Sequence, residues 1–226
     1  MISGETRLVG LLRDPVSPSL SPLMQNAAFA ARGLDWAYVP LPVRADQLEA
    51  GLRGLVALQF AGANVTTPHK LATAKLVETD EPSVNTLVVR DGRIHGSSTD
   101  PAILRGLEST RPAIIGDGGV AVAFAAALPD ALRFSRRGTW PPEVREADLV
   151  INATSERELV LVELQAGQTL VDLPYPLTAT ARAAEAAGAR VVDGLEVLVA
   201  QGAASFEIWT GIPAPVEVMR AAVRSA

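Results

Sequence analysis

The chain contains no cysteine and only two histidines among its 226 residues. Without cysteine it can form no disulfide, no zinc–thiolate site and no thiol nucleophile. The two histidines, His69 and His95, are too few for a conventional histidine-rich metal site. We therefore expect neither thiol chemistry nor a bound metal.

Aromatic residues are also scarce, at 4% of the chain, although hydrophobic residues make up 48%. Much of the apolar content is alanine and valine, a mixture that suits closely packed helices over a buried parallel sheet. No apolar run approaches the length of a membrane span. The N-terminal segment carries Glu5 and Arg7 where a signal peptide would need an apolar core. These features lead us to expect a cytoplasmic protein.

A surplus of positive charge is absent as well. The formal net charge is −5, which gives the whole protein no electrostatic reason to bind nucleic acid or an anionic membrane. Any anion that it binds must be held by a local site.

The first half of the chain alternates apolar runs with helical patterns. Strands are predicted over 7–12, 36–43 and 60–67, and helices over 23–33, 45–58 and 68–77, the last with Pro68 in the favoured first turn. Residues 84–98 are predicted to form a hairpin that turns at Asp91-Gly92.

A second cycle begins after Arg111, with strands predicted over 112–116, 131–137, 147–154 and 168–175 and a helix over 179–189. Two further helical stretches flank 209–215. Residues 136–150 connect two predicted strands almost directly, without most of the expected intervening helix. This alternation predicts an α/β fold with a parallel sheet in each half.

Residues 116–121 carry the clearest cofactor pattern. Gly116, Gly118 and Ala121 fit GxGxxA between a strand and a helix, where a glycine turn and the helix N-terminus can hold a pyrophosphate. A structural turn is the alternative, but the strand–turn–helix context favours a dinucleotide.

The next predicted strand ends in Ser135-Arg136-Arg137. An NAD site usually has an acidic residue there to bind the ribose 2′-hydroxyl. Two guanidinium groups could instead bind a 2′-phosphate bidentately. A solvated basic turn is the alternative. We therefore expect NADP as the cofactor, with NAD less favoured.

Polar residues gather at the ends of the predicted strands in the first half. They are Ser19, Ser21, Asn26, Asn64, Thr66, Lys70, Asn85, Thr99 and Asp100. Each alone could be a cap, a turn residue or a surface charge. Their joint placement favours a site, because active-site residues of α/β sheets gather at strand ends.

These residues lie in segments that resemble the motifs of the shikimate dehydrogenase family. The segments SLSPLMQN, GANVTTPHK, VNTLVV and STD, followed by GDGG, NATS, DLPY and LVAQGAASFEIWTG, stand in the family's order. The resemblance implies a mixed or parallel α/β substrate domain over 1–102, completed by helices at 204–226. It also implies a Rossmann-like NADP-binding domain over 103–203.

The same resemblance implies reversible, NADP-dependent reduction of 3-dehydroshikimate to shikimate, a step toward chorismate and the aromatic amino acids. It implies that Lys70 and Asp100 are catalytic, with Lys70 transferring the proton and Asp100 holding its ammonium. The residues implied to bind the substrate are Ser19, Ser21, Asn64, Thr66, Asn85, Tyr175 and Gln201. Those implied to bind the cofactor are Gly116, Gly118, Gly119, Ser135, Arg136, Arg137, Thr154 and Gly194.

Two alternatives remain open at the level of sequence. The same fold could act on quinate or another cyclic hydroxy acid. The shortened nucleotide half could instead indicate a ligand-binding relative with weak or no dehydrogenase activity. The family resemblance is compatible with a monomer or a homodimer.

Overall fold

The computed structural model describes residues 2–14 and 19–226. The chain divides into two compact units, unit 1 (Met1–Thr99 and Val199–Ala226) and unit 2 (Asp100–Leu198). The second boundary falls inside one continuous helix, α6 (Gly194–Thr210), five residues before the position that we expected from the sequence. No change in pattern marks that point, because the helix continues through it.

Unit 1 is built on a five-stranded mixed sheet with the order β2-β1-β3-β4-β5. Its strands are β1 (Arg7–Arg13), β2 (Trp36–Pro42), β3 (Gly62–Val65), β4 (Thr86–Arg90) and β5 (Arg93–Ser97). The first three are parallel, whereas β4 pairs antiparallel with both β3 and β5. Asp91 and Gly92 both have positive φ, as a two-residue hairpin turn requires, so the predicted hairpin is confirmed.

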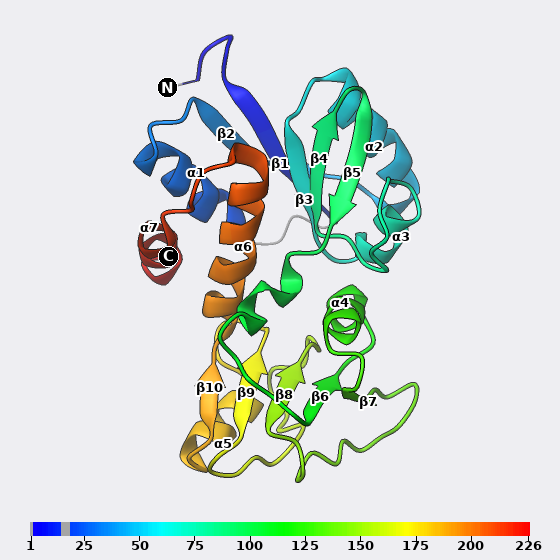
Figure 1. Ribbon diagram of the computed structural model, residues 1–226, viewed down its shortest axis with the longest axis vertical. Coiled ribbons are helices and arrows are strands. Elements are labelled where there is room, and N and C mark those ends of the chain that lie inside the picture. Colours follow the sequence, from blue (N-terminus) through cyan, green and yellow to red (C-terminus); the bar gives the residue numbers. More distant parts are fainter. Residues whose placement is uncertain (1, 15–18) are drawn as a thin grey trace. The chain divides into compact units, whose positions relative to one another are not determined.

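Helices cover both faces of this sheet (Figure 1). They are α1 (Ser21–Ala31), α2 (Leu48–Ala57) preceded by the 3₁₀ turn η1 (Ala45–Gln47), α3 (Lys70–Ala74), the second part of α6, and α7 (Val216–Arg224). Side chains alternate between the faces of a strand. Leu12, Ala63 and Leu87 therefore pack with α2, while Gly62 lies so close to Trp209 of α6 that a Cβ would meet its indole nitrogen at 2.7 Å.

The helix predicted over 68–77 is shorter in the structure, and the expected place of Pro68 was wrong. The helix α3 begins at Lys70, two residues after Pro68. Residues 66–69 form a turn instead, in which the His69 amide donates to the Thr66 carbonyl at 3.0 Å and the Thr67-Pro68 peptide is cis.

Unit 2 holds a fully parallel five-stranded sheet with the order β10-β9-β8-β6-β7. Its strands are β6 (Pro112–Ile115), β7 (Leu132–Phe134), β8 (Leu149–Asn152), β9 (Thr169–Asp172) and β10 (Arg190–Val192), the last of which the sequence did not predict. Its helices are η2 (Asp100–Leu104), α4 (Gly119–Ala127), α5 (Ala179–Ala186) and the start of α6. The strand order reverses direction between β6 and β8, so the switch point of the sheet lies there.

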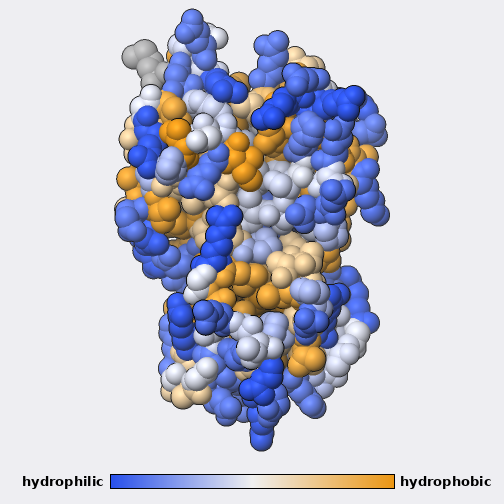
Figure 2. All heavy atoms as spheres, viewed as in Figure 1, coloured by the Kyte–Doolittle hydropathy of each residue, from blue (hydrophilic) through white to orange (hydrophobic). Residues whose placement is uncertain are grey.

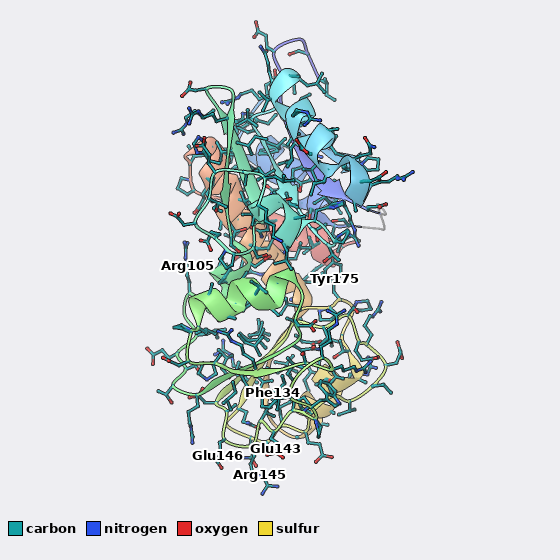
Figure 3. The ribbon with its side chains drawn as sticks, turned by 90° about the vertical axis from the view of Figure 1, so that its right-hand side faces the viewer. Arg105, Phe134, Glu143, Arg145, Glu146 and Tyr175 are labelled. Atoms are coloured by element: carbon teal, nitrogen blue, oxygen red, sulfur yellow. The ribbon has the colours of Figure 1, made fainter. Side chains whose placement is uncertain are left out.

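Two long loops lie beside α5 on one face of this sheet, where further helices could have packed. Neither 135–148 nor 153–168 contains a helix, and both segments lie wholly within the described residues. Val144 and Ala147 from the first loop, and Val162 and Leu164 from the second, pack with α5 on the sheet. Figure 3 shows the charged residues Glu143, Arg145 and Glu146 of the first loop pointing away from the sheet. The predicted absence of a helix after β7 is thus confirmed.

No helix of the described ranges, 2–14 and 19–226, is long and apolar enough to cross a membrane. On the face shown in Figure 2, hydrophilic side chains dominate around the β4–β5 hairpin.

Asp148 ties the start of β8 to the segment before β6. Its carboxylate accepts hydrogen bonds from the Ser109 hydroxyl, from the Thr110 amide and hydroxyl at 2.8 Å, and from the Arg111 amide at 3.1 Å. Burial alone would raise the pKa of Asp148, but these hydrogen bonds together hold the pKa well below its usual value. The charged carboxylate is therefore the form that the fold stabilises.

We predict that Asp148→Asn lowers the free energy of unfolding of unit 2 by about 1–2 kcal/mol at pH 7, because a neutral amide accepts hydrogen bonds more weakly. Since the folded-state pKa is depressed, this difference is fully present above about pH 4 and is lost as the pH falls further. Urea unfolding at several pH values measures it. Glu146→Gln, at an exposed side chain paired with Arg111, is the control and should change stability little.

Candidate functional site

The polar residues of unit 1 meet on the sheet face that α6 covers. Strand register explains why: Asn64 pairs with Leu11 on one side and with Thr86 on the other. Because residues paired across neighbouring strands point to the same face, Asn64 and Thr86 project together from the middle of the sheet. Both side chains are buried.

The Asn64 amide is the centre of this group. Its nitrogen lies 3.0 Å from the Asn85 carbonyl oxygen, 3.2 Å from the Thr86 hydroxyl and 3.0 Å from the Ser205 hydroxyl of α6. Its oxygen accepts from the Tyr38 phenol at 2.9 Å. Two hydrogens are shared among three acceptors, so the amide is engaged on both sides by the protein itself.

Asn85 is held by the chain that follows the hairpin. Its Oδ1 accepts from the Thr99 amide at 2.7 Å, from the Thr99 hydroxyl at 3.1 Å and from the Thr86 hydroxyl at 3.0 Å. Its Nδ2 donates to Gln201 Oε1 across 3.4 Å. Gln201 in turn accepts, through its backbone carbonyl, from Ser205 at 2.9 Å. Three candidate residues, Asn64, Asn85 and Gln201, thus belong to one buried network.

Ser19 and Ser21 extend the network toward α1. The Ser19 hydroxyl donates to the Ser21 hydroxyl across 3.3 Å. Burial raises the pKa of Tyr38 far above its usual value, and a hydrogen bond with Ser21 opposes this shift only in part. The phenol therefore stays protonated and remains a donor to Asn64.

The remaining candidates of unit 1 lie on the turn and helix after β3. Thr66 is partly buried, and its backbone amide donates to the Leu12 carbonyl at 3.1 Å. Lys70 is 6% exposed and has an interaction partner, as a buried lysine usually does. Asp100, the first residue of η2 in unit 2, is also 6% exposed.

The sequence did not predict three members of the network as site residues, namely Tyr38, Thr86 and Ser205. Ser205 carried a usable signal, since it follows Gln201 by one helical turn and therefore shares its face. Thr86 directly follows Asn85, and only the antiparallel register reveals that it points the same way as Asn64. Tyr38 belongs to a strand whose pattern resembles that of an ordinary half-buried strand.

In unit 2, the predicted glycine turn joins β6 to α4. Gly116 has φ +127°, and a Cβ there would meet the Ala153 carbonyl oxygen at 2.9 Å. Gly118 caps α4 with extended backbone, and a Cβ there would meet nothing within 4 Å. Gly119 is the first residue of the helix, and Ala121 is buried beneath it. The turn therefore lies at the switch point, beside the end of β8.

Ser135, Arg136 and Arg137 follow β7 in a tight turn, which the Gly138 amide closes on the Ser135 carbonyl at 3.0 Å. Arg136 lies 3.7 Å from Glu156 Oε2, and its guanidinium carbon stands 5.6 Å from the Trp140 ring centroid. Arg137 lies 3.5 Å from Asp117 of the glycine turn. Each guanidinium thus has an acidic neighbour.

Thr154 follows β8 and is fixed by its hydroxyl, which donates to Asn152 Oδ1 at 2.8 Å. Asn152 donates to the buried Asp172 at 2.7 Å, and burial raises the pKa of Asp172. Gly194 opens α6, where a Cβ would lie 2.4 Å from the Leu173 carbonyl oxygen, so only glycine fits. Tyr175 is partly buried after β9.

A parallel α/β unit with a glycine turn at its switch point defines the class of Rossmann-like dinucleotide-binding proteins. Two family models match the chain. Residues 11–87 match the shikimate dehydrogenase substrate binding domain, and residues 194–224 match the shikimate 5′-dehydrogenase C-terminal domain.

Relatives that match over nearly the whole chain indicate the same family. A protein of Anaeromyxobacter sp. (strain Fw109-5), named shikimate dehydrogenase (NADP(+)), is 40% identical, covering 99% of this chain and 98% of the relative. A protein of the same name from Moorella thermoacetica is 38% identical over 100% and 95% of the two chains. The chain belongs to the shikimate dehydrogenase family.

Solved structures share the fold. A shikimate dehydrogenase in complex with NADP+ superposes with a TM-score of 0.90 at 29% identity, covering 100% of this chain and 97% of that one. The enzyme from Thermus thermophilus, in complex with NADP(H) and shikimate, gives a TM-score of 0.86 at 30% identity, covering 97% and 99%. The alignment with the Anaeromyxobacter protein spans 272 positions, so that relative carries segments which this 226-residue chain lacks.

We predict that Thr86→Val, which keeps the shape and removes one hydroxyl, lowers the free energy of unfolding by about 1–3 kcal/mol, because Asn85 and Ser205 each lose a buried partner. Denaturant unfolding measures this. Thr79→Val, where the hydroxyl accepts from the Glu81 amide at 3.0 Å, should cost less than about 1 kcal/mol. Equal costs at both positions would contradict a cooperative network.

Proposed function

We propose that this protein catalyses the NADP-dependent, reversible reduction of 3-dehydroshikimate to shikimate. The observation that carries the proposal is the buried hydrogen-bonded network around Asn64, in a unit that also buries Lys70. A polyhydroxylated ring acid needs such a set of fixed donors and acceptors, because a site built to bind hydroxyl groups rejects analogues that lack them. The family membership points to the same substrate.

The substrate-binding residues would bind different groups of the substrate. The Ser19 and Ser21 hydroxyls would donate to the ring carboxylate. Asn64, Thr66, Asn85 and Gln201 would bind the ring hydroxyls, and Tyr175 would add a contact from the segment after β9. Because the protein already holds the two asparagine amides in place, little order is lost when the substrate binds.

Lys70 would transfer the proton. Its ammonium would donate to the ring ketone oxygen, stabilise the negative charge that develops there and release the proton to it. Asp100 would provide the carboxylate that balances the ammonium charge. In the reverse direction the neutral amine would take the hydroxyl proton back.

Unit 2 would hold the dinucleotide, and its residues fit one. The open space over Gly118 leaves the backbone accessible to a pyrophosphate, and the N-terminus of α4 favours an anion. Arg136 and Arg137, with Ser135, would bind the 2′-phosphate, while Thr154 and Gly194 would lie at the nicotinamide end. When bound, the reduced cofactor supplies the hydride.

We further propose a cytoplasmic protein, monomeric or homodimeric. With a formal net charge of −5, it should depend on no nucleic acid or anionic membrane surface. Its working partners are then its substrate and its cofactor.

We predict that Lys70→Ala lowers kcat for shikimate oxidation with NADP+ by about 10²–10⁴-fold, because proton transfer loses its positioned group. The rate of NADPH formation, followed by absorbance, measures turnover, and circular dichroism checks the fold. Lys75→Ala is the matched control, since Lys75 ends the same short helix with an exposed side chain. Retained turnover in Lys70→Ala would refute the assigned role.

The same assay separates the alternatives. A higher kcat/KM for quinate than for shikimate would favour the cyclic-acid alternative. Shikimate binding without turnover, together with no binding of either dinucleotide by calorimetry, would favour the ligand-binding relative.

We predict opposite behaviour at two glycines of the turn. Gly118→Ala should change stability by less than about 0.5 kcal/mol, yet weaken NADP+ binding by about tenfold or more, because its methyl group enters the space left for the pyrophosphate. Gly116→Ala should lower the free energy of unfolding by about 1–3 kcal/mol, since it combines positive φ with a backbone clash. Thermal unfolding and calorimetry separate the two effects.

A further inference from the structure

We propose that Glu156 is a specificity-determining residue that weakens binding of the phosphorylated dinucleotide by opposing the 2′-phosphate at Arg136. This inference rests on the proposed function, in which Arg136 meets that phosphate. It adds a repulsive group to a site otherwise described by its attractive ones.

Glu156 is held firmly in place. Its Oε1 accepts from the backbone amides of Arg157 at 3.0 Å, Glu158 at 3.1 Å and Leu159 at 3.3 Å. Its own amide donates to the Thr154 hydroxyl at 3.2 Å. The carboxylate cannot swing away when an anion arrives without giving up these hydrogen bonds. The backbone hydrogen bonds also lower the pKa of Glu156, with a smaller contribution from Arg136, so the group is charged at neutral pH.

The contact between the two groups is electrostatic rather than a fixed hydrogen bond. The distance of 3.7 Å between Arg136 and Glu156 Oε2 exceeds the usual hydrogen-bond range of about 2.7–3.2 Å. The Arg136 side chain is 64% exposed, and that of Glu156 is 26% exposed. Glu156 therefore restrains Arg136 weakly, and the guanidinium also lies over the Trp140 ring. A bound phosphate would gain the arginine and still face the carboxylate.

Arg137, the second arginine of the turn, likewise lies beside a carboxylate. Arg137 lies 3.5 Å from Asp117, and Asp117 is a residue of the glycine turn. The two arginines and two carboxylates carry no net charge together. A site with two unopposed arginines would favour the 2′-phosphate more strongly than this one does.

The test is calorimetric titration of the full-length protein and its Glu156→Gln variant with two probes, adenosine 2′,5′-bisphosphate and 5′-AMP. Glutamine keeps an oxygen for the three backbone amides and replaces the charged Oε2 with a neutral amide nitrogen. We expect the bisphosphate to bind about three- to tenfold more tightly to Glu156→Gln, because one unit charge a few ångströms from the phosphate has been removed. Binding of 5′-AMP should stay unchanged, and the gain should shrink in about 0.5 M salt, where the Debye length is short.

Glu158→Gln is the matched control, because its exposed carboxylate lies two residues further along the same loop. Asp117→Asn is a second variant that should act in the same direction through Arg137. The ratio of kcat/KM for NADP+ to that for NAD+ should rise in parallel with the calorimetric gain. Thermal unfolding confirms that each variant is folded.

Weaker bisphosphate binding in Glu156→Gln would overturn the proposal, since it would mean that the carboxylate positions the arginine. An equal gain for both probes would overturn it too, because the effect would not depend on the phosphate. If the wild-type protein turns over NADP+ with shikimate but the variants bind both probes unchanged, only this inference fails. If the wild-type protein binds no dinucleotide, the proposed function fails with it.

Discussion

The Asn64 amide is the interaction on which the rest of unit 1 depends. It lies at the centre of the sheet, where it joins β2 through Tyr38 and α6 through Ser205. A buried amide without partners would cost several kcal/mol, so the neighbouring strands and α6 must stay in register to satisfy it. The helix α6, more than a hundred residues away in sequence, is thereby needed to complete the network. If Asn64 also binds the substrate as proposed, one side chain meets a functional and a folding requirement together.

In unit 2, long loops take part in covering one face of the sheet. The segments 135–148 and 153–168 cross the sheet without helices, yet Val144 and Leu164 still fill the apolar layer. Irregular backbone pairs fewer of its own polar groups than a helix does. The side-chain amide of the buried Gln168 donates to the Val144 and Ala147 carbonyls at 2.8 Å and 2.6 Å. Compactness is therefore obtained by side-chain hydrogen bonds that substitute for helical ones.

Sequence patterns predicted most elements because their periodicity is local. The Asp91-Gly92 turn, the helices α1 and α4 and the strands around them follow directly from side-chain pattern and turn chemistry. The pattern failed where a feature other than local periodicity decides the outcome. The start of α3 is set by the turn at Thr66, and β10 is only three residues long. Tyr38 and Thr86 join the site through strand register, which no single segment reveals. The roles of Lys70, Asp100 and the other site residues stay predictions.

An acidic protein that binds a polyanionic dinucleotide must create its attraction locally. The backbone amides of the glycine turn and the N-terminus of α4 provide a field that follows from the fold alone. In the proposed site they would act on the pyrophosphate, which NAD and NADP share, so they could not tell the two apart. In the proposed site, discrimination would come from side-chain charge, where Glu156 and Asp117 lie beside Arg136 and Arg137. Under this proposal, binding depends on a fixed backbone, whereas cofactor choice depends on a small difference between opposing, partly exposed charges, which single substitutions would shift.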